Sequence, residues 1–330
     1  MLWKNRKVLV TGADGFIGSH LVERLVTQGC RVRAFVYYNS FNSWGWLDHA
    51  SLQVAKCIEI FPGDIRDPNG VAEACRGVDT IFHLAALIGI PFSYHSPDSY
   101  IDTNVKGTLN ILQAARKCKV KKVIHTSTSE VYGTAQYAPI DEKHPINPQS
   151  PYAASKSAAD SLALSFYSSF DLPVVVLRPF NTYGPRQSAR AVIPTILTQV
   201  CAGQKSVKLG NLQVTRDFNF VSDTVEAFLR LAESDGGPGE VFNAGSGLET
   251  SLREVIAAIR KITGIDFKVV VGKERLRPQK SEVERLVCNA DKLRGVSGWK
   301  PRVSLEEGLK QTYLWIRKNR HRYKEGIYNV

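Results

Sequence analysis

Short runs of apolar residues alternate with amphipathic stretches over the first half of the chain. Six runs rich in β-branched residues predict strands over 7–11, 31–36, 57–61, 80–84, 122–126 and 173–177. Between them, apolar residues recur at helical spacing, most clearly over 68–75, 99–117 and 151–170. Strands that alternate with helices predict a parallel sheet covered on both faces, and therefore an α/β fold.

The pattern changes after Arg178-Pro179, where shorter and mixed elements follow. It predicts helices over 192–202, 251–263 and 305–317, strands over 207–209 and 267–271, and one strand over 240–243 that returns to the main sheet. A chain of 330 residues is long for a single core. We expect a larger domain over 1–180, with the returning strand near 240–244, and a smaller mixed α/β domain that covers mainly 181–330.

The composition, 43% hydrophobic and 22% charged, is typical of a soluble globular protein. The apolar stretches are too short or too interrupted to cross a bilayer, and the early strand leaves no room for a signal peptide. Six cysteines without paired spacing favour a reducing compartment and argue against a zinc site. We expect a cytoplasmic protein with no membrane partner and no metal.

The net charge of +12 could indicate nucleic acid, an anionic membrane surface or a phosphorylated substrate as the partner. Basic residues are spread along the chain, apart from clusters at 116–122 and 318–324. Both clusters are typical of a solvated helix end and a solvated tail. We therefore expect no nucleic-acid partner.

Three glycines, Gly12, Gly15 and Gly18, lie between the first predicted strand and the next helix. The first permits a tight turn, the second lets the backbone approach a pyrophosphate, and the third lets the helix pack on the strand. Phe16 and Ile17 open that helix, whose N–H groups and positive dipole end would face a diphosphate. The pattern predicts a dinucleotide site on a Rossmann-type, doubly wound parallel sheet.

Two further segments follow predicted strands at the edge where ligands bind in such sheets. Asp64 and Ile65 would reach the adenine, and the segment His83, Leu84, Ala85 and Ala86 would pass beneath the nicotinamide ribose. The second strand ends without an acid to bind a ribose hydroxyl and without an adjacent arginine to bind a 2′-phosphate. The cofactor is therefore NAD or NADP. In the insertion that follows, Trp44 and Trp46 would either line the cofactor or pack with other aromatic rings.

Residues 126–133 read Thr-Ser-Thr-Ser-Glu-Val-Tyr-Gly, and Tyr152 and Lys156 follow one helical turn apart. We expect the lysine ammonium to lower the phenol pKa from its usual value of about 10. Thr128 can hydrogen-bond the same substrate hydroxyl, so the set predicts proton removal from an alcohol as its hydride leaves for a nicotinamide. Glu130 adds a carboxylate that simple alcohol oxidation does not need.

Together these motifs resemble the extended short-chain dehydrogenase/reductase family, in its nucleotide-sugar epimerase/dehydratase branch. The resemblance runs over nearly the whole chain through the glycine loop, His83–Ala86, Asn104, Thr128, Tyr152, Lys156, Arg178–Arg186 and Arg216–Phe218. It implies a dinucleotide-binding domain followed by a nucleotide-sugar domain, and a tightly bound cofactor regenerated in each turnover. It also implies a homodimer through the helices at 99–117 and 151–170.

Glu130 implies a 4,6-dehydratase within that branch, because 4-epimerases of the family usually carry a small or neutral residue there. The resemblance implies that the carboxylate removes the proton beside a transient 4-ketone and that water leaves from the 6-position. Ser129 stands where many dTDP-glucose dehydratases place an aspartate. Protonation of the leaving hydroxyl therefore falls either to Glu130 or to a water relay.

The resemblance also implies substrate contacts: Asn181, Arg216 and Arg277 at the diphosphate, and Val192 beside the base. The acid that usually follows the Arg277-Pro278 pair is absent from this pattern. The segments 38–42, 86–95 and 278–285 look most like dehydratases of the legionaminic-acid type, which act on UDP- or GDP-linked N-acetylglucosamine. We expect a 4,6-dehydratase of a nucleotide-linked hexosamine.

Three alternatives stay open. UDP-glucuronate decarboxylation would need cations around the sugar carboxylate, and the segment 88–95 offers only His95. A nucleotide-sugar 4-epimerase is disfavoured by Glu130. A non-catalytic dinucleotide-binding regulator would typically lose Tyr152 or Lys156, and this chain keeps both.

Overall fold

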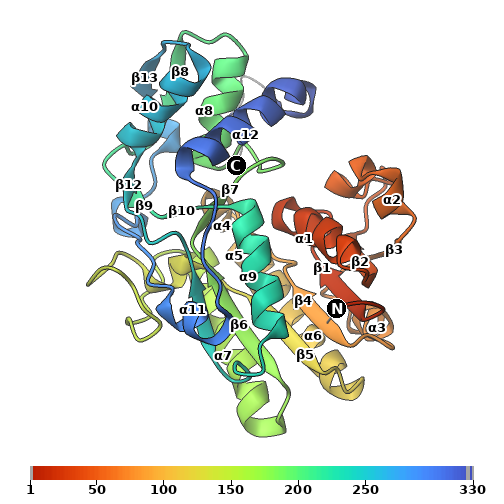
Figure 1. Cartoon of the computed structure of the whole chain (residues 1–330). Coiled ribbons are helices and arrows are strands. Elements are labelled where there is room, and N and C mark those ends of the chain that lie inside the picture. The colour runs from red at the N-terminus through yellow and green to blue at the C-terminus, as the bar shows by residue number, and fades with distance from the viewer. Residues whose placement is uncertain (1–2, 325–327, 329–330) are drawn as a thin grey trace.

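A seven-stranded parallel sheet forms the centre of the computed structural model, which describes residues 3–324 and 328 (Figure 1). The strand order is β3-β2-β1-β4-β5-β6-β11, and every neighbouring pair is parallel. The strands are β1 (Lys7–Thr11), β2 (Arg31–Tyr37), β3 (Ile58–Gly63), β4 (Thr80–His83), β5 (Lys122–Thr126), β6 (Val174–Pro179) and β11 (Val241–Ala244). This topology confirms the predicted Rossmann-type α/β fold.

Helices cover both faces of the sheet. They are α1 (Phe16–Thr27), α3 (Pro68–Ala74), α6 (Gly107–Lys117), α7 (Pro151–Phe170) and α9 (Val221–Glu233). On one face α3 packs against α6, and α6 packs against α7; on the other, α1 packs against α9. The sheet therefore lies between two helical layers, with the strand ends free to carry functional residues.

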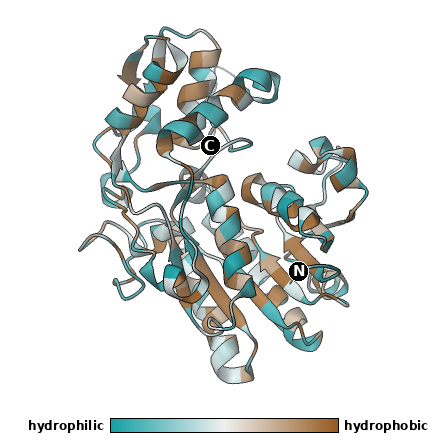
Figure 2. Ribbon diagram, in the orientation of Figure 1, coloured by the Kyte–Doolittle hydropathy of each residue, from teal (hydrophilic) through white to brown (hydrophobic). Residues whose placement is uncertain are grey.

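The core is divided in two by the sheet, because successive side chains of a strand point to opposite faces. Val8 and Val10 of β1 belong to the cluster that includes α1 and α9, whereas Leu9 belongs to the cluster with α3, α6 and α7. All residues of β4 and β6 are buried, as expected for strands covered on both sides. In Figure 2 the central strands are accordingly mostly hydrophobic.

Helix α9 is absent from the elements that the sequence pattern predicts. It follows β10 (Phe218–Phe220) directly and has no side-chain cap at its start. Its buried residues Val221, Val225, Phe228 and Leu229 nevertheless recur at helical spacing. Both α9 and β11 come from the second half of the chain, yet β11 is a strand of the main sheet and α9 covers one face of it. The two-domain division itself stays a prediction.

The remaining elements of the second half form a smaller mixed assembly. Its helices are α8 (Val192–Cys201), α10 (Leu252–Thr263) and α12 (Leu305–Lys318), whereas α11 (Asp291–Ser297) packs against α9 and β11 of the main sheet. Its other strands form two-stranded sheets, in which β10 pairs with β7 (Asn181–Tyr183), β12 (Thr250–Ser251) with β9 (Thr215–Arg216), and β13 (Lys268–Val271) with β8 (Ser206–Leu209). Helix α12 packs against α8 and α10, at the top of Figure 1. The short helices α2 (Leu52–Ala55), α4 (Ile90–Ser93) and α5 (Pro97–Tyr100) lie in connections of the first half.

The helix predicted over 99–117 is interrupted. Between α5 and α6 the chain forms a π-helical segment, Ile101–Lys106, a rare conformation often found at functional sites. Asn104 lies in this segment; its Oδ1 accepts from Leu87 N at 2.8 Å, and its Nδ2 donates to Leu87 O and to Ser155 Oγ at 2.9 Å. The segment thus ties α7 to the chain that leaves β4. The homodimer expected through these helices stays a prediction.

Candidate functional site

The glycine loop is compact enough that side chains would not fit in it. Gly12 has φ +67°, and a Cβ there would lie 2.8 Å from Ala85 N, while a Cβ at Gly18 would lie 2.1 Å from Gly12 O. Gly15 precedes α1, and no side chain caps that helix, so its first N–H groups, at Phe16, Ile17 and Gly18, face the loop without a side-chain partner. This cradle of bare backbone at a helix N-terminus fits the diphosphate of a dinucleotide.

The end of β4 is fastened beside this loop. Thr11 Oγ1 accepts hydrogen bonds from Leu84 N and Ala85 N, both at 3.1 Å, and lies 2.8 Å from His83 Nδ1. Burial lowers the pKa of His83 well below its usual value, so this imidazole is neutral and structural. The half-buried segment Leu84–Ala86 therefore runs along the glycine loop, where the pattern predicts the nicotinamide ribose.

Asp64 and Ile65, the residues predicted at the adenine, contact other residues of the protein. Arg66 donates through Nε and Nη2 to the Asp64 carboxylate, and these bonds lower the Asp64 pKa. Ile65 is buried against Gly107 at the start of α6. In the insertion after β2, Trp46 packs edge-on against Trp315 at 5.2 Å, which is the aromatic-packing alternative rather than a cofactor wall.

Glu130 lies in a single turn of 3₁₀ helix, Ser129–Tyr132, just after β5. Thr128 caps this turn, because its Oγ1 accepts from Glu130 N at 3.2 Å. Both Ser129 and Glu130 are buried. Burial is the main cause that raises the pKa of Tyr152, and the charge of the Glu130 carboxylate adds to it; the same charge also acts on Arg216.

Tyr152 and Lys156 lie on the first two turns of α7, and both are buried. The Tyr152 ring packs edge-on against Tyr100 at 6.2 Å. Burial raises the pKa of the Tyr152 phenol well above its usual value, and a hydrogen bond with Thr128 opposes this shift. Thr128, Glu130, Tyr152 and Lys156, which the sequence separates, thus share one site.

The expectation that Lys156 lowers the phenol pKa is wrong for this conformation. Lys156 Nζ donates to the carbonyl oxygen of Thr126 at the end of β5. Burial lowers its own pKa to about 8, opposed by the charge of Asp160. Because desolvation dominates both groups, the phenol pKa is raised instead of lowered.

Asn181 and Arg216, predicted at the diphosphate, begin β7 and end β9. Among the described residues, the Asn181 side-chain oxygen is buried without a hydrogen-bond partner, as expected of an atom that awaits a ligand. The Arg216 guanidinium is also buried and donates to the carbonyls of Thr215 and Val283 at 2.9 and 2.6 Å. Val192, predicted at the base, is the half-buried first residue of α8.

Gln279 follows the Arg277-Pro278 pair directly, so the usual acid is absent there, but Glu282 comes four residues after Pro278. Glu282 lies 3.6 Å from Arg277 and 3.8 Å from Arg216. The sequence does not indicate these contacts, because nothing in the local pattern pairs Glu282 with a strand more than sixty residues earlier. The two arginines and this acid form one cluster.

A cation that the sequence pattern does not indicate lies beside the segment after β4. The side chain of Arg190 approaches Gly89, and its charge acts on Tyr100, whose hydroxyl donates to the Gly89 carbonyl. Tyr100 in turn contacts the Tyr152 ring. Arg190 lies in the loop that leads into α8, and Tyr100 stands between it and Tyr152.

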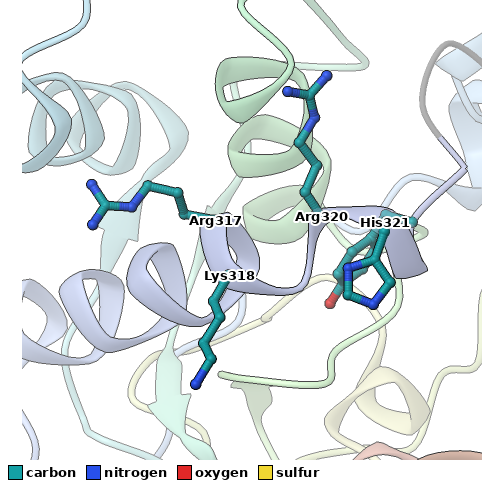
Figure 3. Close-up of a pocket in the computed structure, with 5 residues that line it drawn as sticks. Arg317, Lys318, Arg320 and His321 are labelled. Carbon is teal, nitrogen blue, oxygen red and sulfur yellow. The ribbon is translucent and has the colours of Figure 1, made fainter.

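A separate surface pocket lies at the end of α12, lined by Arg317, Lys318, Arg320, His321 and Tyr323 (Figure 3). None of the predicted site residues lines it. The tail expected to be solvated is anchored here, because Tyr323 Oη donates to Gln187 O at 3.0 Å and its ring packs on Trp315. Within residues 3–324 and 328, no cluster of His, Cys, Asp or Glu could hold a metal, and no helix is long and apolar enough to span a bilayer.

Comparisons with known proteins agree with this geometry. A family profile described as GDP-mannose 4,6 dehydratase matches residues 9–312. A UDP-glucose 4-epimerase of Mycolicibacterium smegmatis is 36% identical over 94% of this chain and 98% of its own. A UDP-N-acetyl-alpha-D-glucosaminuronate decarboxylase of Bacillus cytotoxicus is 36% identical over 95% and 98%. A crystal structure of a dTDP-glucose 4,6-dehydratase double mutant from Streptomyces venezuelae, with NAD bound, superposes with a TM-score of 0.85 at 30% identity over 96% and 98%. These relatives differ in reaction.

Proposed function

Because the chain belongs to the GDP-mannose 4,6 dehydratase family, we propose that it is an NAD(P)-dependent 4,6-dehydratase of a nucleotide-linked hexosamine. The substrate is UDP- or GDP-N-acetylglucosamine, and the product is the 4-keto-6-deoxy sugar. The observation that carries the proposal is the buried carboxylate of Glu130, whose charge acts on Tyr152. An enzyme that only oxidised an alcohol would not need the Glu130 carboxylate.

The cofactor of the proposed reaction binds at the glycine loop and the end of β4, where bare backbone surrounds the first turn of α1. A nicotinamide dinucleotide held there would supply a hydride acceptor and, later, the hydride donor, so the reaction would be redox-neutral. The related Streptomyces dehydratase has NAD bound, which favours NAD for this chain.

Tyr152 and Thr128 handle the first proton. The Tyr152 Oη removes the proton of the sugar 4-hydroxyl as the hydride departs, and Thr128 Oγ1 orients that hydroxyl. The raised pKa of Tyr152 means that the phenolate forms only when a cation compensates it. The Lys156 ammonium, on the same face of α7, supplies that charge once it turns from the Thr126 carbonyl.

Glu130 then acts beside the new ketone. The ketone acidifies the proton at the 5-position, and the Glu130 carboxylate removes it. The C6–O bond breaks, and the leaving hydroxyl takes a proton from Glu130 or from a relayed water, because Ser129 is not a strong acid. Return of the hydride to the 6-position and of a proton to the 5-position completes the product, with net loss of one water.

A second candidate is decarboxylation of a nucleotide-linked uronic acid, and Arg190 favours it. The side chain of this exposed arginine reaches Gly89 in the segment after β4, where the sequence pattern offers only His95, and its charge acts on Tyr100. A carboxylate on the sugar would find a partner there. The relative from Bacillus cytotoxicus, named as a decarboxylase of such a sugar, supports keeping this candidate.

Product mass separates the candidates. The purified protein is incubated with UDP-N-acetylglucosamine, GDP-N-acetylglucosamine, UDP-glucuronate and UDP-N-acetylglucosaminuronate. Loss of water from a hexosamine is the result we expect. Loss of carbon dioxide from a uronate would replace the proposal with decarboxylation, and isomerisation without a mass change would replace it with epimerisation.

The role of Glu130 has its own test. In deuterated water the product gains deuterium at the 5-position if a protein group exchanges that proton. The Glu130→Gln variant should lose this uptake and its turnover. Normal uptake in the variant would remove Glu130 from the mechanism.

A further inference from the structure

One buried guanidinium joins the two segments that carry the catalytic groups. Arg178, in β6, donates from Nε to Asp160 Oδ2 at 3.0 Å, and its Nη1 donates to Tyr132 Oη at 2.9 Å. Asp160 lies on α7, one turn after Lys156, and Tyr132 ends the 3₁₀ turn that carries Glu130. Arg178 therefore contacts both α7 and that turn.

The contact continues beyond Tyr132. Tyr132 Oη donates to Asn243 Oδ1 of β11 at 2.8 Å, and Ser127 Oγ donates to Asp160 Oδ2 at 2.7 Å. All of these side chains are buried, Tyr132 completely. The chain of hydrogen bonds thus joins β11, β6, α7 and the residue after β5, and it contains none of the groups assigned to proton transfer.

Stability alone is a weak reason to bury such a network. A buried ion pair gains little over apolar residues of similar volume, but it fixes one arrangement of the groups it joins. The turn that carries Glu130 is four residues long and ends at Gly133, whose φ is +66°. The hydrogen bond to Thr128 fixes the backbone at Glu130, but a single turn of 3₁₀ helix has poor hydrogen-bond geometry of its own. The hydrogen bond from Arg178 to Tyr132 adds a contact from outside the turn and so restricts its movement.

We propose that Arg178, acting through Tyr132, is a positioning residue that holds the Glu130 carboxylate in register with the catalytic face of α7. The inference rests on the proposed function, because it assumes that Glu130 removes a proton. It predicts that loss of the contact disturbs the step that needs Glu130 more than the oxidation that needs Tyr152.

Tyr132→Phe tests this. The variant keeps the ring but removes the hydroxyl between Arg178 and Asn243. Since a misplacement of about 1 Å can cost on the order of 100-fold in rate, we expect dehydration to slow by between tenfold and 100-fold. Oxidation at the 4-position should persist, so reduced nicotinamide accumulates on the enzyme and is read by its absorbance after mixing with UDP- or GDP-N-acetylglucosamine, whichever the wild type dehydrates.

Two further variants make the result decisive. Tyr183→Phe is the matched control, because Tyr183 is also almost completely buried, and its hydroxyl donates to Leu305 O in the second half of the chain. Arg178→Lys keeps the charge beside Asp160 but cannot bridge to Tyr132, and it should reproduce the accumulation. Unchanged dehydration in both site variants, or oxidation and dehydration lost in equal measure, would overturn the inference.

Glu130→Gln, measured alongside, separates the two proposals. If the wild type loses no water from either N-acetylglucosamine substrate, the proposed function fails. If the wild type dehydrates and Glu130→Gln dehydrates equally well, the assumed role of Glu130 fails and the positioning inference fails with it. If Glu130→Gln accumulates reduced cofactor but Tyr132→Phe and Arg178→Lys do not, the positioning inference alone fails.

Discussion

Glu282 lies 3.6 Å from Arg277, which precedes it by five residues in the chain. The same carboxylate oxygen lies 3.8 Å from Arg216, so one acid stands between two guanidinium groups. Burial lowers the pKa of Arg216, and the like charge of Arg277 acts in the same direction. The cluster keeps a net positive charge that a diphosphate can neutralise, and arginine forks suit phosphate oxygens.

We predict that Arg277→Gln weakens substrate binding without changing the chemistry. KM for the nucleotide sugar should rise about tenfold or more with kcat nearly unchanged, because a diphosphate contact acts equally on ground and transition states. Steady-state kinetics provide the measurement. Arg285→Gln is the matched control, since Arg285 pairs with Glu249 at the surface. A fall in kcat with KM unchanged would place Arg277 elsewhere.

Gly12→Ala should abolish retention of the cofactor. Gly264 has the same φ of +67° as Gly12, but a Cβ at Gly264 would meet nothing within 4 Å. Gly264→Ala therefore measures only the backbone cost, about 1–2 kcal/mol. Gly12→Ala adds a clash with Ala85, so its thermal midpoint should fall further and purified protein should carry less dinucleotide by mass spectrometry. Equal losses in both variants would show that close approach is unimportant.

Tyr152→Phe should reduce turnover by about 100-fold to 10,000-fold, the usual contribution of a general base. The change removes one hydroxyl from a side chain that is 8% exposed, so the fold and the bound cofactor should persist. Product mass and cofactor content together report the outcome. A variant that keeps its turnover would refute the assignment of the phenol.

The depressed pKa of Lys156 predicts a pH-dependent effect on stability. Below pH 8 the lysine is charged in both folded and unfolded chains, so burial of the ammonium costs free energy. Between about 8 and its usual value of 10.5, the unfolded chain holds a proton that the folded chain has released, and stability rises with pH. The rise is at most about 1.4 kcal/mol per pH unit.

Lys156→Met should therefore be more stable than the wild type at pH 7, and this advantage should shrink as pH rises from 8 toward 10.5. Thermal unfolding midpoints across that range provide the measurement. Lys205→Met, at an exposed lysine, should differ from the wild type by a constant amount. Parallel pH curves for Lys156→Met and the wild type would mean that the pKa is not depressed.

The parts of the fold that the sequence predicts well carry their own local signals. Helix α7 begins and ends where the pattern places it, because Ser150 caps its start, Pro151 opens it, and Asp171 ends it in a left-handed conformation. The glycine loop and the central strands are similarly marked by glycine spacing and β-branched runs. Thr128 follows β5, and Tyr152 and Lys156 lie in the first two turns of α7, so the same local signals place these three predicted residues.

The parts that the sequence misses depend on contacts between distant segments. Arg178 and Asp160 are eighteen residues apart and belong to different elements, so nothing local indicates their ion pair. Arg190 lies in a loop, and its position beside Gly89 follows from the tertiary fold. The direction of the Tyr152 pKa was wrong for the same reason, since burial is a property of the folded chain.

The loop from 134 to 149 joins the Glu130 turn to the start of α7, and it is bound by its backbone to the segment that follows Arg277. Ala135 N donates to Arg285 O at 3.1 Å, Ile140 N donates to Val287 O at 2.7 Å, and Gln149 Nε2 donates to Glu282 O at 3.1 Å. Neither stretch can shift without breaking these bonds. The backbone therefore couples the proposed diphosphate contact of Arg277 to the turn that carries Glu130, and lengthening or shortening the 279–281 turn should disturb both.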